Sequence, residues 1–221
     1  GALVRELPRA RVVVHRRGAK HLADPSRLVA SVRQAVGDRF PLYGEAIPIP
    51  EGRLQVAEDG ERFPVGGQLI RVVDAPGHAP HHLCFLEETK GLLFTGDAAG
   101  LFLGGRLLPA TVPPSFDLEL SLSTLERLSS LGPKALCYTH FGLRPGAEGL
   151  SEYAELLPRW LELVRSVWEE AGEDEGAALR LALEELAQGG WPVGDPLLRE
   201  DLLISVRGAL LHLKRREADP A

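Results

Sequence analysis

Residues Val72–Gly100 of this 221-residue chain read VVDAPGHAPHHLCFLEETKGLLFTGDAAG. An apolar run from Gln68 to Asp74 predicts a strand, which breaks at Pro-Gly and presents His78 on the turn. Two further strands are predicted at residues 83–86 and 92–95, and the second ends at Gly-Asp97. Two strand ends therefore present a histidine and a carboxylate, each beside a glycine that permits close approach of the backbone.

The same pattern recurs 43 positions after Asp97, where the apolar run Ala135 to Tyr138 ends in Thr-His140-Phe-Gly. Three predicted strands thus end in potential metal ligands, each next to or near a glycine. Neutral imidazole and carboxylate are the ligands of a hydrolytic Zn²⁺ or a similar ion, which keeps one position open for water. The three residues therefore form one candidate constellation.

The motifs PGHAPHH, TGD and THFG, in this order, resemble those of the metallo-β-lactamase-fold superfamily of metal-dependent hydrolases, which includes glyoxalase II. The resemblance covers Gly1 to about Gly142. It implies an α/β (α+β) fold, a four-layered αββα sandwich of which this chain is the C-terminal portion, followed by a helical segment. It also implies that His78, Asp97 and His140 bind metal, that Asp97 bridges two ions, and that Asp97 and His78 are catalytic.

The chain departs from the family pattern in one respect: the HxHxDH motif is absent from its 221 residues. We expect this motif upstream of Gly1, because the chain contains no methionine and because residues 1–6 have the composition of a helix end. Three ligands cannot fill two metal sites, since about three protein ligands plus water are expected at each catalytic zinc. The chain as given is therefore expected to lack a complete active site.

Two more residues are predicted to support the ligands rather than to bind metal. His82 matches the second histidine of the family's PGHxxxH pattern, where a supporting or packing role is expected. Asp74 ends its strand just before the motif, and orienting a ligand histidine or capping the turn are equal alternatives. We interpret His15 and His21 as structural because they match no ligand spacing, and His212 as a packing residue because it lies on the apolar face of the last predicted helix.

Composition limits the classes of partner. The formal net charge of −6 gives no electrostatic footprint for nucleic acid, and no apolar run approaches the length of a membrane span. Cys84 and Cys137 both lie in strand-like runs and are expected to be buried thiols in a reducing cytoplasm rather than a disulfide. The absence of asparagine and methionine, with arginine far exceeding lysine, favours a heat-adapted source.

The rest of the chain predicts two regions, a metallo-β-lactamase-like domain over residues 1–148 and a helical segment over 149–221. A strand is expected at 11–15 and a helix begins after an Asp-Pro-Ser cap at 24–26. Residues 37–64 predict loops, with a short strand around Ile47. Residues 100–114 predict a loop that lines a substrate pocket or simply packs. Helices are expected from Ser115 or Asp117 to residue 132, and over 148–171, 175–188 and 196–216.

The function implied is hydrolysis of an ester, thioester or related bond in a small acyl-type substrate by water that a dinuclear zinc site activates, with iron or manganese as alternative metals. Two other hypotheses remain at this point: a mononuclear iron oxygenase of the same fold, and a non-catalytic truncated module. The C-terminal helices cover the site, pack on a second copy in a homodimer, or do both.

Overall fold

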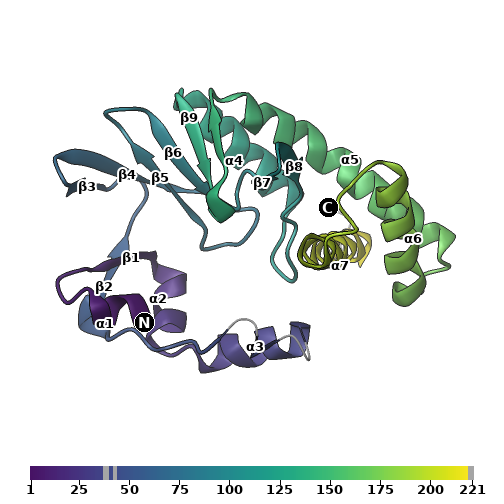
Figure 1. Cartoon of the computed structure of the whole chain (residues 1–221), viewed down its shortest axis with the longest axis horizontal. Coiled ribbons are helices and arrows are strands. Elements are labelled where there is room, and N and C mark those ends of the chain that lie inside the picture. The colour runs from purple at the N-terminus through teal and green to yellow at the C-terminus, as the bar shows by residue number, and fades with distance from the viewer. Residues whose placement is uncertain (37–39, 42–43, 219–221) are drawn as a thin grey trace. The chain divides into compact units, whose positions relative to one another are not determined.

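The computed structural model describes residues 1–36, 40–41 and 44–218. It divides the chain into two compact units, Gly1–Glu61 and Arg62–Ala221. Its elements are labelled in Figure 1.

The first unit pairs two short parallel strands with three helices. Its elements are α1 (Ala2–Glu6), β1 (Val12–His15), α2 (Arg16–Ala23), α3 (Ser26–Val36), the 3₁₀ turn η2 (Glu51–Arg53) and β2 (Leu54–Ala57). The predicted cap of α3 is confirmed, because the Asp24 carboxylate accepts a hydrogen bond from the Ser26 amide at 3.1 Å. The strand expected around Ile47 is wrong: the strand lies at β2 instead. Residues 37–39 and 42–43 of the predicted loop lie outside the described residues.

The second unit is built on a six-stranded sheet, with strand order β10-β9-β6-β5-β4-β3. All neighbours are antiparallel except β6 and β9, which run parallel. The strands are β3 (Arg62–Val65), β4 (Gln68–Asp74), β5 (Leu83–Glu87), β6 (Leu92–Gly96), β9 (Ala135–Tyr138) and β10 (Leu143–Pro145). The four strands predicted around the motifs are confirmed.

Because β6 and β9 run parallel, their carboxyl ends meet at one edge of the sheet, which is where the TGD and THFG motifs follow. The turn after β4 reaches the same edge, since β4 is antiparallel to β5 and β5 is antiparallel to β6. The topology therefore brings the three predicted motifs to one side of the second unit.

Helices and sheet share one hydrophobic core in this unit. The helices are α4 (Leu118–Ser130), α5 (Glu148–Glu170), α6 (Glu175–Gln188) and α7 (Pro196–Ala218), and the 3₁₀ turn η3 covers Thr139–Phe141. In Figure 1, α4 and α5 lie along the sheet, while α6 and α7 pack at the far end of α5. The core runs without interruption from strand residues such as Leu93 and Leu136 to helix residues such as Trp160, Leu186 and Val206, all of them buried.

The C-terminal helices are thus part of the core of the second unit. The boundary expected at residue 148 stays a prediction about domain organisation. None of the helices within the described ranges combines the length and the apolar character that crossing a bilayer demands.

The segment after β6 is more ordered than predicted. Residues 101–103 and 106–108 form a hairpin, β7 (Leu101–Leu103) and β8 (Arg106–Leu108), around Gly104 and Gly105, both at positive φ. Two consecutive positive-φ residues suit the tight turn that matches strand twist. Leu101 is buried, so the packed alternative, and not an exposed loop, describes this segment.

Candidate active site

His78 lies on a turn that is pinned to the start of α4. The Gly77 carbonyl accepts a hydrogen bond from the Asp117 amide at 2.8 Å, and the Pro76 carbonyl accepts one from the Thr124 hydroxyl at 2.6 Å. Gly77 has φ +131°, and a Cβ there would lie 2.5 Å from the Ser121 Cα. Only glycine fits this close approach, which explains the glycine before the histidine.

One ring nitrogen of His78 is committed to the backbone. Nδ1 lies 2.8 Å from the Ala110 carbonyl oxygen. A carbonyl oxygen only accepts, so Nδ1 carries the proton and the neutral ring keeps its lone pair on Nε2. That Nε2 lies 3.6 Å from Oδ2 of Asp97. This tautomer is the one that a metal-binding histidine needs when it binds through Nε2.

Asp97 follows β6 and is held on two sides. Its Oδ1 accepts a hydrogen bond from the Thr139 hydroxyl at 2.6 Å, and its amide donates to Nε2 of His82 at 3.0 Å. Gly96, at φ +53°, lies so close to His82 that a Cβ there would meet the imidazole at 2.4 Å. The Oδ2 atom is therefore aimed at His78 by contacts at the other oxygen and at the amide.

His82 supports Asp97 as a neutral ring. Burial, and then the neighbouring His78, lower the pKa of His82 to about 4. The ring is therefore uncharged near neutral pH, as its role of acceptor from the Asp97 amide requires. It also meets the His78 ring edge to face, with ring centroids 5.6 Å apart. These contacts are of the kind expected of a residue that orients ligands.

His140 lies in η3 with φ 63° and ψ 26°, in the left-handed region, and is exposed. Phe141 follows at φ 68° and is fully exposed. Non-glycine residues in this region are uncommon and mark turns that the surroundings impose.

Asp201 of α7 is a neighbour of the site that sequence reasoning missed. Burial raises the pKa of its carboxyl, while the nearby His140 lowers that pKa and Asp97 raises it. The sequence offered no signal for this neighbour, because Asp201 is an ordinary acidic residue in a charged helix.

The donors of His78 and Asp97 fit a metal ion. Two ligand atoms at 2.0–2.2 Å from one tetrahedral zinc lie about 3.3–3.5 Å apart, close to the observed 3.6 Å between Nε2 and Oδ2. Among the described residues, no group of three histidine, cysteine, aspartate or glutamate side chains is gathered closely enough to hold an ion. His78 and Asp97 therefore form a two-ligand pair, and the assignment of His140 as a third ligand stays a prediction.

Three other residues singled out in the sequence, Asp74 and the two cysteines, lie near the motifs along the chain. Asp74 ends β4, where its carbonyl accepts a hydrogen bond from Arg127 at 3.1 Å, and its predicted orienting role stays a prediction. Cys84 is a buried free thiol, as predicted, and donates to the Thr95 carbonyl. Cys137 is also free, although it is only partly buried.

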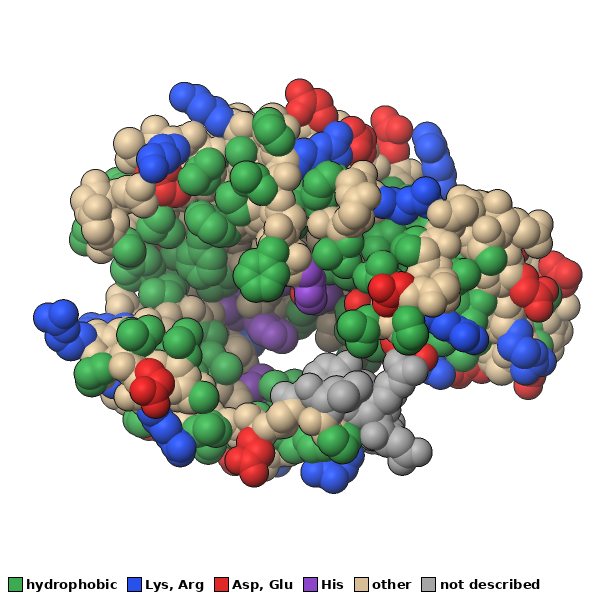
Figure 2. Space-filling view, in the orientation of Figure 1, with side chains coloured by type: hydrophobic (Ala, Val, Ile, Leu, Met, Phe, Trp, Pro, Cys, Tyr) green, Lys and Arg blue, Asp and Glu red, His purple; other side chains and the backbone are tan. Residues whose placement is uncertain are grey.

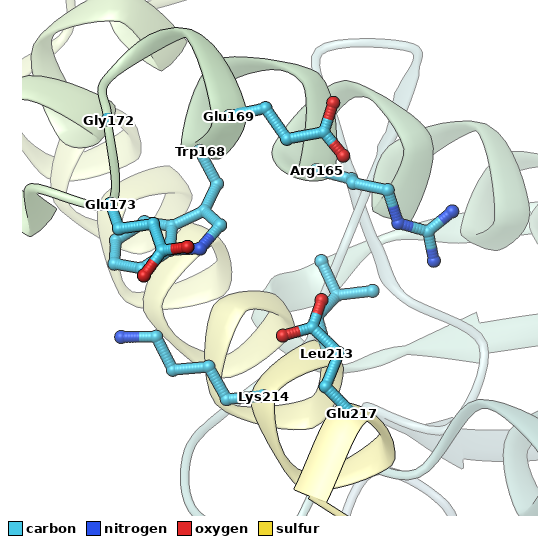
Figure 3. Close-up of a pocket in the computed structure, with 8 residues that line it drawn as sticks. All are labelled: Arg165, Trp168, Glu169, Gly172, Glu173, Leu213, Lys214 and Glu217. Atoms are coloured by element: carbon cyan, nitrogen blue, oxygen red, sulfur yellow. The ribbon is translucent and has the colours of Figure 1, made fainter. Parts of the chain in front are cut away.

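A groove of about 550 Å³ lies elsewhere in the second unit, between the end of α5 and α7. Figure 3 shows Trp168 with the Lys214 side chain beside it, and the ammonium lies 4.0 Å from the centre of the indole ring. The lining residues are Arg165, Trp168, Glu169, Gly172, Glu173, Leu213, Lys214 and Glu217. None of the predicted ligands lines it, so this groove is separate from the histidine and aspartate pair.

Residues 2–140 match the family model described as the metallo-beta-lactamase superfamily. A metallo-beta-lactamase fold-containing protein of Sulfurisphaera tokodaii is 32% identical over 139 residues, which are 61% of this chain and 52% of that protein. An atrochrysone carboxyl ACP thioesterase of Cryptosporiopsis sp. is 49% identical over 67 residues, 28% of this chain and 21% of that protein.

Solved structures agree on the fold. A crystal structure of an archaeal metallo-beta-lactamase superfamily protein from Sulfolobus tokodaii has a TM-score of 0.63 at 28% identity, over 70% of this chain and 60% of that one. A metallo-beta-lactamase family protein from Thermus thermophilus has a TM-score of 0.60 at 21% identity, over 96% of this chain and 68% of that one. The chain spans about half the length of the Sulfurisphaera relative.

Proposed function

The chain belongs to the metallo-beta-lactamase superfamily, and on that premise we propose that it serves a metal-dependent hydrolase that cleaves an ester, thioester or related bond. The observation that carries the proposal is the pairing of His78 Nε2 with Asp97 Oδ2 at 3.6 Å, with the remaining polar atoms of both side chains already engaged. Two donor atoms are thus left facing one point, at a separation that suits a bound cation.

We propose that His78, Asp97 and His140 hold the metal, with zinc in a dinuclear centre as the preferred occupant and iron or manganese as alternatives. A bound ion of this kind supplies a water of lowered pKa and polarises the scissile carbonyl. The chain's own part is to present His78 with Nδ1 bonded to the Ala110 carbonyl and Nε2 facing Asp97, and to keep the Asp97 carboxylate fixed through Thr139. His82, neutral because of burial, holds the Asp97 amide in place.

An acyl or thioester substrate is favoured because thioesterases are among the relatives, over part of this chain. Nucleic acid is disfavoured by the net charge of −6. On the face shown in Figure 2, basic and acidic side chains are also interspersed. We further propose a cytoplasmic, heat-adapted protein that acts away from membranes on a small molecule. A homodimer through the C-terminal helices is proposed as its assembly.

Metal content and thioester cleavage test the proposal together. The full-length protein, with the residues expected upstream of Gly1, is purified and analysed for zinc, iron and manganese, and thiol release from a series of acyl thioesters is measured with and without added zinc. Two equivalents of zinc with metal-dependent thiol release support the hydrolase. One equivalent of iron without thiol release favours the oxygenase hypothesis, and a protein that neither binds metal nor cleaves thioesters favours a binding module.

The Asp97→Asn variant is the matched control, because it keeps the size of the side chain and its bond to Thr139 while removing the charge. Thiol release that survives in this variant at the wild-type rate would contradict the proposed role of the pair.

A further inference from the structure

The Ala110 carbonyl that fixes His78 belongs to a segment, residues 109–116, which we name the strap and which is buried at residues 109–111 and at residue 116. The strap follows β8 and leads into α4. Ala110 and Thr111 are buried, at 4% and 0% exposure, so the strap runs through the protein interior at this point. A buried backbone needs partners for its polar groups, and those partners determine where the Ala110 carbonyl lies.

The first partner comes from α5. The hydroxyl of Tyr153, a residue only 2% exposed, accepts a hydrogen bond from the Ala110 amide at 3.0 Å. Ala110 therefore donates a hydrogen bond to Tyr153 through its amide and accepts one from His78 through its carbonyl oxygen. The phenol and the imidazole are connected through a single residue of the backbone.

The second set of partners comes from α7. Ser205 donates from its hydroxyl to the Pro109 carbonyl at 2.9 Å, and its own carbonyl accepts from the Thr111 hydroxyl at 2.6 Å. The residues on both sides of Ala110 are thus bonded to one residue of α7. Trp160 of α5 completes the network, because its indole N–H donates to the Thr111 hydroxyl at 3.0 Å.

These contacts leave the strap little freedom around Ala110. The side chains of the network, Thr111, Tyr153, Trp160 and Ser205, are each at most 2% exposed. Buried polar networks whose members are satisfied rigidify the groups they join. The hydrogen bond at one ring nitrogen of a histidine sets which nitrogen carries the proton. By holding the Ala110 carbonyl against Nδ1 of His78, the network keeps the lone pair on Nε2, although none of its side chains contacts Nε2.

We propose that Tyr153 and Ser205 are positioning residues for His78, which hold the strap so that the Ala110 carbonyl fixes the Nδ1–H tautomer and aims Nε2 at Asp97. The metal-binding side of this inference rests on the proposed function, whereas the control of the tautomer does not. The C-terminal helices would then serve the site directly, through the strap, rather than only cover it.

The tautomer of His78 is the decisive readout. Two-dimensional ¹H–¹⁵N spectra of the metal-free protein at about pH 8, where histidine is neutral, distinguish the two tautomers. The signals of His78 are assigned by their loss in His78→Gln. The wild type is expected to show the Nδ1–H form. Tyr153→Phe, which leaves the Ala110 amide without its partner, is expected to show a mixture of the two forms.

Tyr138→Phe is the matched control. Tyr138 is also a buried tyrosine of the second unit, and its hydroxyl has no hydrogen-bond partner among the described residues. It should leave the tautomer unchanged. A second pair of variants acts on the other anchor: Thr111→Val removes the hydroxyl that meets Ser205 and Trp160, whereas Thr111→Ser keeps it. The valine variant should mix the tautomers and the serine variant should not.

Zinc affinity gives a second, separate readout by calorimetry. Loss of a group that orients a ligand typically lowers metal affinity about 10–100-fold, and Tyr153→Phe should lower it about 10-fold against Tyr138→Phe. If folded Tyr153→Phe and Thr111→Val both keep the pure Nδ1–H form, the inference is overturned. If the wild type binds no zinc while the tautomers change as expected, the proposed function fails and the positioning role stands.

Discussion

Gly208 of α7 offers a sharp test of how closely this helix packs on the strap. Glycine inside a helix normally costs about 1 kcal/mol relative to alanine. If the space around Gly208 were open, Gly208→Ala would therefore stabilise the protein. Gly208 is buried, however, and a Cβ there would lie 2.0 Å from the Thr111 carbonyl oxygen and 2.9 Å from the Pro113 nitrogen. These neighbours are backbone atoms, which cannot rotate away.

The cost follows from the displacement that the methyl group forces. Ordinary contact begins near 3.4 Å, so helix and strap must separate by more than 1 Å. That movement stretches the two hydrogen bonds of Ser205, now 2.6 and 2.9 Å long, beyond useful length. Overpacking costs about 1–3 kcal/mol, and each orphaned buried polar group costs about 1–3 kcal/mol. After subtraction of the helix gain of about 1 kcal/mol, the low ends of these ranges still leave Gly208→Ala with a free energy of unfolding lowered by at least about 2 kcal/mol.

Urea denaturation followed by circular dichroism measures this difference. Gly176→Ala in α6 is the control, because a Cβ there meets its nearest atom at 3.4 Å, an ordinary contact. The control should be neutral or gain up to about 1 kcal/mol. If Gly208→Ala proves as stable as Gly176→Ala, the close packing of α7 on the strap is wrong.

Three further predictions concern the site and the core. In the full-length protein, Asp97→Ala should abolish hydrolysis and weaken metal binding, whereas His82→Ala should cost about 10–100-fold in rate; equal losses in steady-state assays would mean that the two roles are misassigned. Zinc at a hundredfold excess over its dissociation constant should add about 2.7 kcal/mol of stability, and a chelator should reverse the shift in the thermal midpoint; an unchanged midpoint would argue against a built site. Burial lowers the pKa of His212 below its ordinary 6.5, while Asp117 raises it and Arg215 lowers it. The unfolded chain therefore binds more protons, stability should fall as pH drops through and below 6.5, and His212→Leu should make urea midpoints measured between about pH 5 and 7.5 less dependent on pH.

Much of the second unit could be predicted because its elements carry local signals. The helices α4, α6 and α7 begin and end close to the predicted bounds, and an aspartate caps α4 at residue 117 and α6 at residue 174. The strands β4, β5, β6 and β9 follow apolar runs that end at, or a few residues before, a glycine or proline. These features depend on neighbours in the sequence, which is the information that periodicity contains.

The elements that were missed have weaker local signals. α2 is an arginine-rich helix with a glycine inside, and its cap is His15, whose Nδ1 accepts from the Arg17 amide. A histidine is an unusual cap, so the start of this helix went unrecognised. β7 and β8 had a usable signal in Gly104-Gly105 between apolar residues, whereas β10 is three residues long and contains Pro145.

The motifs predict the ligands, but they contain no signal for the contacts that orient them. His78 is oriented by a backbone carbonyl 32 positions away, and a carbonyl is present at every residue. That carbonyl is held in turn by Tyr153 and Ser205, which lie 43 and 95 positions beyond it. In a sequence, both appear as ordinary members of helices, because a tyrosine on an apolar face or a serine among leucines predicts only burial.

The stability of the C-terminal helices and the chemistry of the site are therefore linked through the strap. α5 and α7 bury residues such as Trp160 and Val206 in the common core, so variants there are expected to act first on stability. The same helices supply the hydrogen bonds on both sides of Ala110, so a loosened helix also releases His78 from its fixed tautomer. A strap displaced by more than 1 Å, as expected in Gly208→Ala, should break the bonds that aim Nε2, so we expect this variant to lose the geometry of His78 while it is still folded.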